Sequence, residues 1–96
     1  MKKKEEKIRI EFTGLFNKQR KEVPLEIKIA FRETLDLFLE NPDHKILRKH
    51  FLKEKYAGYQ SIDITPDYRA IFKEVKTERH VSIKFYIIGA HKQLYG

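Results

Sequence analysis

The side chains best suited to chemistry at neutral pH are four histidines, at positions 44, 50, 80 and 91. Imidazole titrates near pH 6.5, roughly, so one histidine can accept a proton while another donates one. Their spacing matches no helical metal motif and the sequence has no cysteine, so no metal site is predicted. Metal-free acid–base chemistry is the option that remains. His44 and His80 lie in turn-like contexts and are interpreted as surface residues.

Positive charge is concentrated around His50. The chain has 21 Lys and Arg against 14 Asp and Glu, which gives a net charge of +7. More than half of this excess falls between Lys45 and Lys55, where five basic residues accompany only Glu54. The excess favours an anionic partner, which could be nucleic acid, a membrane surface or an acidic protein. The same run also fits a solvated edge strand whose lysines discourage aggregation.

Length and composition predict one soluble domain. We assign residues 1–96 to it, with residues 1–7 as a solvated lead-in. The lack of cysteine excludes a disulfide framework and a thiol nucleophile, and it fits a cytoplasmic location. No apolar run approaches the roughly 20 residues of a membrane span. Because no phosphate-binding glycine motif and no GxSxG elbow occur, enzymes that use nucleotide cofactors are disfavoured.

The N-terminal half predicts one strand and two helices that must support these residues. Apolar and charged residues alternate over residues 8–12, as in a strand with one buried face. Thr13 can cap a short helix that ends near Val23, and Pro24 suits the first position of a second helix. The second helix has an apolar stripe at helical spacing, formed by Ile27, Phe31, Leu35 and Phe38.

The C-terminal half predicts a run of strands, over residues 47–52, 59–64, 68–75 and 80–88. The fold class is therefore α+β, with an N-terminal strand and a two-helix hairpin that covers one face of a mainly antiparallel sheet. The other face is expected to stay open. Alternation along the strands places on it Asp63, Arg69, Lys73, Lys84 and Tyr86. A basic face with an aromatic residue suits single-stranded nucleic acid, although an ordinary solvated sheet face has the same composition.

Three pieces of the sequence, in this order, resemble the RelE/ParE toxin superfamily and its YafQ-like branch in particular. They are LDLFLENPDHKILRKHFLK, GYQSIDITPDYRAIFK and the closing IIGAHKQLYG. The resemblance covers nearly the whole chain from Ile8 and implies the RelE-like microbial ribonuclease fold. It implies the toxin of a type II toxin–antitoxin system, a ribosome-dependent endoribonuclease that cleaves mRNA without metal or cofactor. The implied partners are a cognate antitoxin, ribosomal RNA and mRNA, with no membrane and no DNA except through the antitoxin complex.

The same resemblance assigns roles to residues. His91 falls on the C-terminal catalytic histidine of the family and is the first choice for general acid. His50 falls on the upstream histidine and Asp67 on the aspartate of the turn, so either could be the general base or orient it. The implied RNA-binding positions are Arg69, Tyr95, Lys53 and Lys55, together with Lys73 and Lys84 of the open face.

Three positions depart from the family pattern. Asp63 stands where the YafQ-like branch more often has a histidine, Gln60 where an arginine is common, and Glu54 where a small residue is usual. An acid beside the site would repel phosphate. Either Asp63 is itself the general base, or the site is tuned differently, or activity is weaker than in relatives.

Two alternative functions remain open. One is a ParE-like toxin that binds a protein target such as DNA gyrase without catalysis, and the other is an RNA-binding domain that lacks chemistry. The combination of His50, Asp67 and His91 favours the enzyme, because a binding module has no need of proton-transfer groups at these positions.

Overall fold

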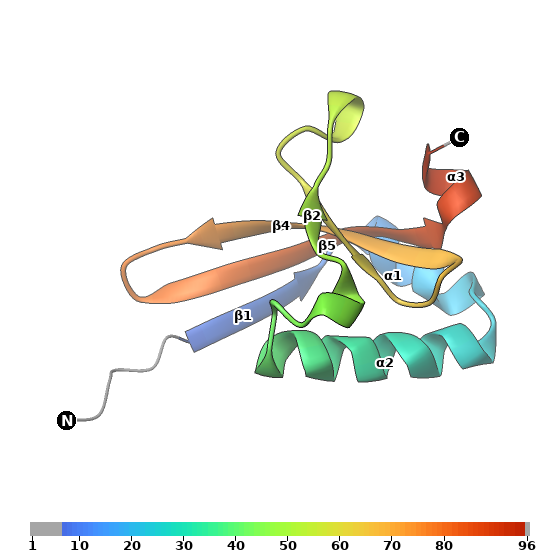
Figure 1. Cartoon of the computed structure of the whole chain (residues 1–96), viewed down its shortest axis with the longest axis horizontal. Helices are drawn as coiled ribbons and strands as arrows, with labels where there is room; N and C mark the ends of the chain where they lie inside the picture. The colour runs from blue at the N-terminus through green and yellow to red at the C-terminus, as the bar shows by residue number, and fades with distance from the viewer. Residues whose placement is uncertain (1–6, 96) are drawn as a thin grey trace.

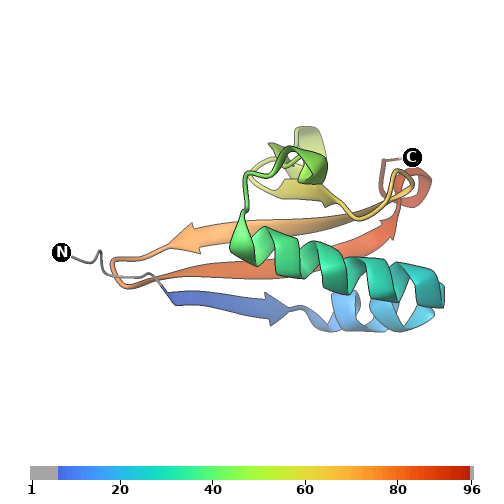
Figure 2. The same cartoon turned by 60° about the horizontal axis from the view of Figure 1, so that its bottom comes forward.

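The computed structural model describes residues 7–95 as one sheet with helices on both of its faces (Figures 1 and 2). The strands are β1 (Lys7–Phe12), β2 (His50–Phe51), β3 (Gln60–Asp63), β4 (Tyr68–Lys76) and β5 (His80–Ala90). The helices are α1 (Gly14–Glu22), α2 (Leu25–Glu40) and α3 (His91–Tyr95), and the single 3₁₀ turns are η1 (Lys45–Leu47) and η2 (Glu54–Tyr56).

The five strands lie in the order β1-β5-β4-β3-β2. β1 runs parallel to β5, and every other neighbouring pair is antiparallel. α2 lies on one side of the sheet, and α1 packs along the end of β5 that β1 does not pair. η2 and α3 lie on the side opposite α2, which we name the outer face (Figure 1). The predicted α+β class and the mainly antiparallel sheet are therefore confirmed.

The core between the helices and the sheet is built around Phe85. Its ring lies 5.4 to 6.3 Å, centroid to centroid, from five other phenylalanine rings: Phe12, Phe16, Phe31, Phe38 and Phe72. The apolar stripe predicted on α2 supplies two of these rings, and Ile27 of the same stripe is also buried. Leu35 packs against the edge of the cluster. The stripe thus faces the sheet, as its spacing predicts.

The predicted helix starts are confirmed to within one residue. Thr13 caps α1, which ends at Glu22 with Val23 as its C-cap. Pro24 is the N-cap of α2 and not its first helical residue, because its ψ of 155° is extended. Its carbonyl accepts hydrogen bonds from the backbone N–H groups of Ile27 and Lys28 at 2.9 and 3.1 Å. A proline fits the N-cap because the missing N–H has no role there.

We expect Thr13→Ala to lower the free energy of unfolding by about 1 kcal/mol, since the cap hydroxyl is lost. The Thr13 hydroxyl accepts from the Phe16 N–H at 3.0 Å and donates to the Tyr86 carbonyl at 2.9 Å, so it also ties α1 to β5. Urea denaturation measures the change. Thr13→Ser keeps both bonds and should retain most of the stability; equal losses in the two variants would contradict the assignment.

The predicted strand over residues 47–52 is wrong except at His50–Phe51, which form the short strand β2. Leu47 is only 1% exposed, so its side chain must enter the core from η1. Arg48 then adopts the left-handed conformation, with a φ of 50°, which redirects the chain. Lys53 is consequently the residue before η2 and Lys55 lies within it, so neither is on a basic strand.

A β-bulge changes which residues of β5 face the core. Ile71 pairs with Ile87 but Phe72 pairs with Phe85, so Tyr86 is the extra residue. Ile88 is therefore buried in the core, whereas Ile87 lies on the outer face. Simple alternation gives the opposite result because it assumes an uninterrupted strand.

The outer face is only partly open. Ser61 and Ile71 are fully buried although their alternation places them on this face. Ile71 lines a hollow together with Tyr56 and Tyr59 of the segment around η2. At the other end of the face, Leu94 of α3 is buried as well. The expectation of a fully open face is corrected: η2 and α3 cover its two flanks.

Candidate active site

The predicted acid–base residues lie along a line that crosses the outer face. In the sheet register, His50 is opposite Ser61, and Asp63, two residues further along β3, is opposite Arg69. Asp67 lies in the turn before β4, where its carbonyl accepts a hydrogen bond from the backbone N–H of His91 at 2.7 Å. The fold thus places Asp67 beside His91 and places His50 at the far side of Asp63 and Arg69.

The ring of His50 is oriented by the backbone before it. Its Nδ1 lies 2.8 Å from the carbonyl oxygen of Arg48. A carbonyl oxygen can only accept, so the hydrogen is on Nδ1, and Nε2 carries the lone pair when the imidazole is neutral. The side chain is exposed. His50 therefore presents to solvent the nitrogen that a general base needs.

His91 is the first residue of α3, and two contacts hold this helix on the sheet. The side-chain oxygen of Gln93 accepts from the Ala90 N–H at 3.0 Å. Beneath the helix lies Gly89, where an added Cβ would approach that oxygen at 3.2 Å and Leu94 Cδ2 at 3.3 Å. A side chain at position 89 would require Gln93 and Leu94 to shift by a few tenths of an ångström, so this glycine favours the close seating of α3.

His50 and His91 are too far apart to touch. Three strand spacings separate β2 from β5, which is about 14 Å at ~4.8 Å per strand. A substrate that lies across the sheet would meet the two imidazoles at different atoms. This separation does not fit a directly hydrogen-bonded dyad.

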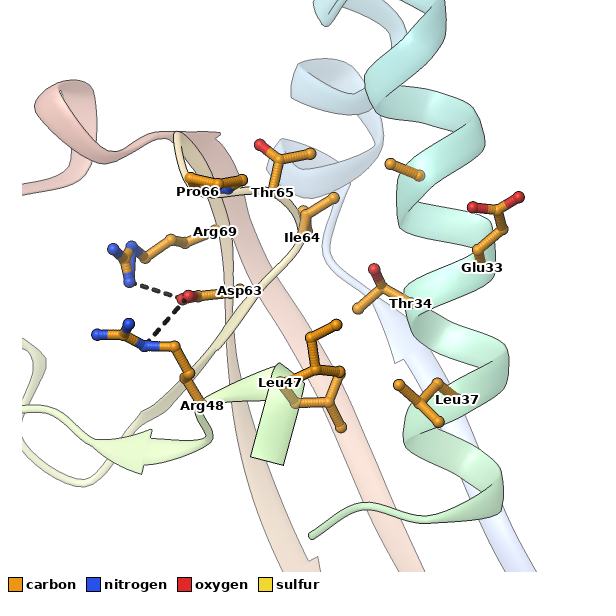
Figure 3. Close-up of a pocket in the computed structure, with 12 residues that line it drawn as sticks. Glu33, Thr34, Leu37, Leu47, Arg48, Asp63, Ile64, Thr65, Pro66 and Arg69 are labelled. Carbon is orange, nitrogen blue, oxygen red and sulfur yellow. Dashed lines mark hydrogen bonds and ion pairs between the residues drawn. The ribbon is translucent and has the colours of Figure 1, made fainter. Parts of the chain in front are cut away.

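Between the two histidines lies an ion-pair cluster of Arg48, Asp63 and Arg69 (Figure 3). Asp63 Oδ1 is 2.7 Å from Arg69 Nη1, and Asp63 Oδ2 is 3.4 Å from Arg48 Nε. Both carboxylate oxygens thus face a guanidinium. This arrangement favours a role for Asp63 in holding the two arginines over a role as general base.

Tyrosines and lysines occupy the middle of the outer face. The rings of Tyr59 and Tyr86 meet edge to face at 4.9 Å. Lys73 Nζ lies 5.3 Å from the Tyr59 ring and Lys84 Nζ lies 5.6 Å from the Tyr86 ring. Lys73 and Lys84 are direct cross-strand neighbours, a like-charge pair that an anion would stabilise. Lys73, Lys84 and Tyr86 therefore share one face, as alternation predicts.

A groove of about 340 Å³ adjoins this patch between η2, α1 and α3. Its lining includes Tyr56, Tyr68, Ile87, Gly89 and Gln93. Aromatic rings beside a basic surface are the features that hold unpaired bases and their phosphates. Gln93 and Leu94 of α3 line this groove, so a strand bound in it would pass beside the helix that begins at His91.

The remaining predicted positions lie at the margins. Lys53 and Lys55 are exposed at η2, where Lys55 Nζ is 5.3 Å from the ring of Tyr56. Gln60 is buried and Glu54 is exposed, with a left-handed φ of 58°. The side chain of Gln60, which departs from the family pattern, therefore does not reach the outer surface. The side chain of Tyr95 lies outside the described residues.

Two residues of the site were missed in the sequence. Arg48 could have been identified because it lies two residues before His50 in a segment rich in positive charge. Tyr59 could have been identified because it alternates in step with Ser61 and Asp63, which places all three on one side of the strand.

Neither a metal site nor a membrane span is found in the part of the chain that the structure describes. Residues 7–95 contain no cluster of three or more His, Asp or Glu side chains that could hold a metal ion. None of the helices within that range combines the length and the apolar character needed to cross a bilayer.

The arrangement of strands, helices and turns is the RelE/YafQ-like toxin fold. The E. coli toxin YafQ superposes with a TM-score of 0.67 at 23% identity, over 91% of this chain and 97% of YafQ. A YoeB/ParE toxin from Agrobacterium tumefaciens gives a TM-score of 0.71 at 14% identity, over 86% of this chain and 98% of that toxin.

A third similar structure is the toxin–antitoxin complex RelBE2 from Mycobacterium tuberculosis, with a TM-score of 0.66 at 17% identity, over 86% of this chain and 96% of that chain. No protein-family model matches the sequence, and no curated protein matches it. The likeness to known proteins is thus carried by the fold.

Proposed function

We propose that this chain is the toxin of a type II toxin–antitoxin pair and that it cleaves ribosome-bound mRNA as a metal-independent endoribonuclease. One observation carries the proposal: His50 on one side and His91 with Asp67 on the other flank the guanidinium groups of Arg48 and Arg69. Two proton-transfer groups on either side of fixed positive charge are what metal-free cleavage of a phosphodiester needs. The shared fold with YafQ supports the same reading.

In the proposed reaction the neutral His50 takes the proton of a ribose 2′-OH through Nε2. The 2′-oxygen then attacks the adjacent phosphorus in line, and the bond from phosphorus to the 5′-oxygen breaks. His91 in its charged form protonates this leaving oxygen, with Asp67 beside it as an orienting group. The products are a 2′,3′-cyclic phosphate and a 5′-hydroxyl. Guanidinium groups at the phosphate stabilise the charge that develops in the transition state, a large term in such reactions.

The rest of the outer face supplies the binding surface. Tyr59 and Tyr86 offer ring faces and edges to bases, and Lys73 and Lys84 offer charge to phosphates. Lys53 and Lys55 extend this positive surface past η2 toward ribosomal RNA. Tyr95, the last residue of α3, completes the proposed set as a stacking residue. None of these roles requires a cofactor.

The proposed inhibitor is a cognate antitoxin with an acidic segment. YafQ is described in complex with DinJ, and RelBE2 is itself a toxin–antitoxin complex. An acidic segment would compete with RNA for the same positive outer face. The proposed location is the cytoplasm, where ribosomes and the antitoxin are present, and contact with DNA would occur only through the antitoxin complex.

A translation-coupled cleavage assay tests the proposal directly. Primer extension on a message translated in the presence of the protein should reveal new 5′ ends within the translated region and none in an untranslated control RNA. A parallel DNA supercoiling assay tests the ParE-like alternative. Inhibited gyrase with intact message would overturn the ribonuclease, and RNA binding without new ends would indicate a binding domain that lacks chemistry.

We expect His50→Asn to lower the rate of cleavage by about 10²-fold, the typical contribution of one proton-transfer group. His44→Asn is the matched control, because both histidines are exposed in the same basic segment and asparagine can keep the cap that His44 Nδ1 gives the Ile46 N–H. The control should retain wild-type activity. Equal activity of the two variants would remove His50 from the mechanism.

A further inference from the structure

The ion-pair cluster on the outer face contains two guanidinium groups and one carboxylate. Asp63 bonds Arg69 at 2.7 Å and Arg48 at 3.4 Å, so one positive charge is left unbalanced. Asp63 and Arg69 are 12% and 15% exposed, whereas Arg48 is 72% exposed. Two of the three side chains are thus held inside the sheet surface, and the third can move with a ligand.

Arg69 does not have its hydrogen-bonding capacity met in this arrangement. The guanidinium offers several N–H groups in a fixed fork, which fits an anion bidentately. Asp63 engages Nη1 of this fork, and the Nε of Arg69 is buried without a hydrogen-bond partner among residues 7–95. A buried donor left unpaired is unfavourable. Asp63 alone therefore does not satisfy the donors of Arg69.

The backbone of Arg48 is held in an uncommon conformation beside the same cluster. Its φ of 50° and ψ of 43° lie in the left-handed region, which is unfavourable for a residue with a Cβ. Such conformations persist where the surrounding structure determines them, and they are concentrated at functional sites. Here the turn directs the Arg48 side chain toward Asp63 and lets its carbonyl orient His50.

There is room beside Asp63 for a larger anion. β2 pairs with β3 only at Gln60 and Ser61, so the Asp63 end of β3 has no neighbouring strand on that side. A hollow of about 560 Å³ lies between the cluster and α2; Arg48, Asp63 and Arg69 line one side of it, and Glu33, Thr34 and Leu37 of α2 line the other. The three side chains of the cluster lie on the side of β3 that faces away from α2 (Figure 3), which is the side that carries His50.

We infer that Asp63 occupies the place of the substrate phosphate in the resting protein and must release Arg48 and Arg69 before RNA can bind. Asp63 acts as an internal competitor, and Arg48 is a second phosphate-binding residue. The inference rests on the proposed function for its ligand, an RNA phosphodiester. In this role Asp63 acts as a competitor of the RNA phosphate and not as a general base. Because Asp63 must be displaced, RNA binds more weakly, and strands that make few other contacts are rejected.

The test measures binding of a single-stranded RNA in which the ribose 2′-hydroxyls are methylated, so that cleavage plays no part. Asp63→Asn should bind more tightly than wild type, and its log–log salt dependence should be steeper by about 0.7 for each phosphate newly contacted. Asp43→Asn is the matched control, because Asp43 forms an exposed ion pair with Lys49 at 3.2 Å and the charge change is the same. It should leave the salt slope unchanged.

A second variant covers the case in which Asp63→Asn does not fold. Arg48→Gln, at a largely exposed position, should weaken binding of the same RNA and reduce the salt slope by about 0.7. Weaker binding by a folded Asp63→Asn protein, or an unchanged slope in Arg48→Gln, would overturn the inference. Because the RNA is not cleaved, these results are separate from the cleavage assay. Cleavage can be confirmed while the competition by Asp63 is contradicted, and the competition can be confirmed while cleavage is contradicted.

Discussion

Replacement of His91 by alanine is expected to lower the rate of mRNA cleavage by about 10²- to 10⁴-fold, the range for loss of one proton-transfer group. His91 is the first residue of α3, where its backbone N–H donates to the Asp67 carbonyl, and it lies across the arginine cluster from His50. It is exposed, so its removal should leave the fold intact. Primer extension on translated message measures the rate, and growth of cells that express the variant without an antitoxin gives a second readout.

His80→Ala is the matched control for this experiment. His80 begins β5 and His91 follows its end, so the two positions carry the same side chain at opposite ends of one strand. The control should stay toxic and should cleave at the wild-type rate. Wild-type cleavage by His91→Ala, with an unchanged circular dichroism spectrum, would exclude His91 as the general acid.

Phe85→Ala is expected to lower the free energy of unfolding by about 3–5 kcal/mol, the usual cost of truncating a buried phenylalanine. Phe85 is fully buried and contacts five other phenylalanine rings, which come from β1, α1, α2 and β4. A domain of this size is stable by only about 5–15 kcal/mol, so much of its margin would be lost. Thermal denaturation and urea titration measure the change.

Phe51→Ala is the matched control for stability. Phe51 is 68% exposed at the edge strand β2, so its truncation should change the free energy of unfolding by no more than about 0.5 kcal/mol. Losses of similar size in the two variants would show that the ring cluster around Phe85 is not the centre of the core.

The fold was predictable where local signals were uninterrupted. The alternation over residues 8–12 and the spacing of Ile27, Phe31 and Phe38 identified β1 and α2, because each period places side chains on one face. The prediction failed at Leu47 and at Ile87 and Ile88, which follow the bulge at Tyr86. Leu47 is drawn into the core by burial, and Tyr86 is an extra residue that pairing with β4 accommodates. Both depend on contacts between distant segments, which a local pattern does not contain.

The candidate site was predictable in its residue types but not in its connections. Its histidines and Arg69 could be named from motifs, whereas the link between Asp63 and the two arginines depends on the turn at Arg48. From the sequence alone, an acidic residue at position 63 is expected to weaken phosphate binding. The structure gives it two partners, so the question at position 63 becomes one of competition between two anions.

The place of β5 in the sheet has a consequence for synthesis of the protein. β5 is the last of the five strands to be made, yet it lies between β1 and β4 and contacts both. Until it emerges, β1 has no partner and the ring cluster lacks its centre. Pairing between distant segments is also the slow part of folding. We therefore expect the nascent chain to lack a stable sheet and core until β5 has been released from the exit tunnel.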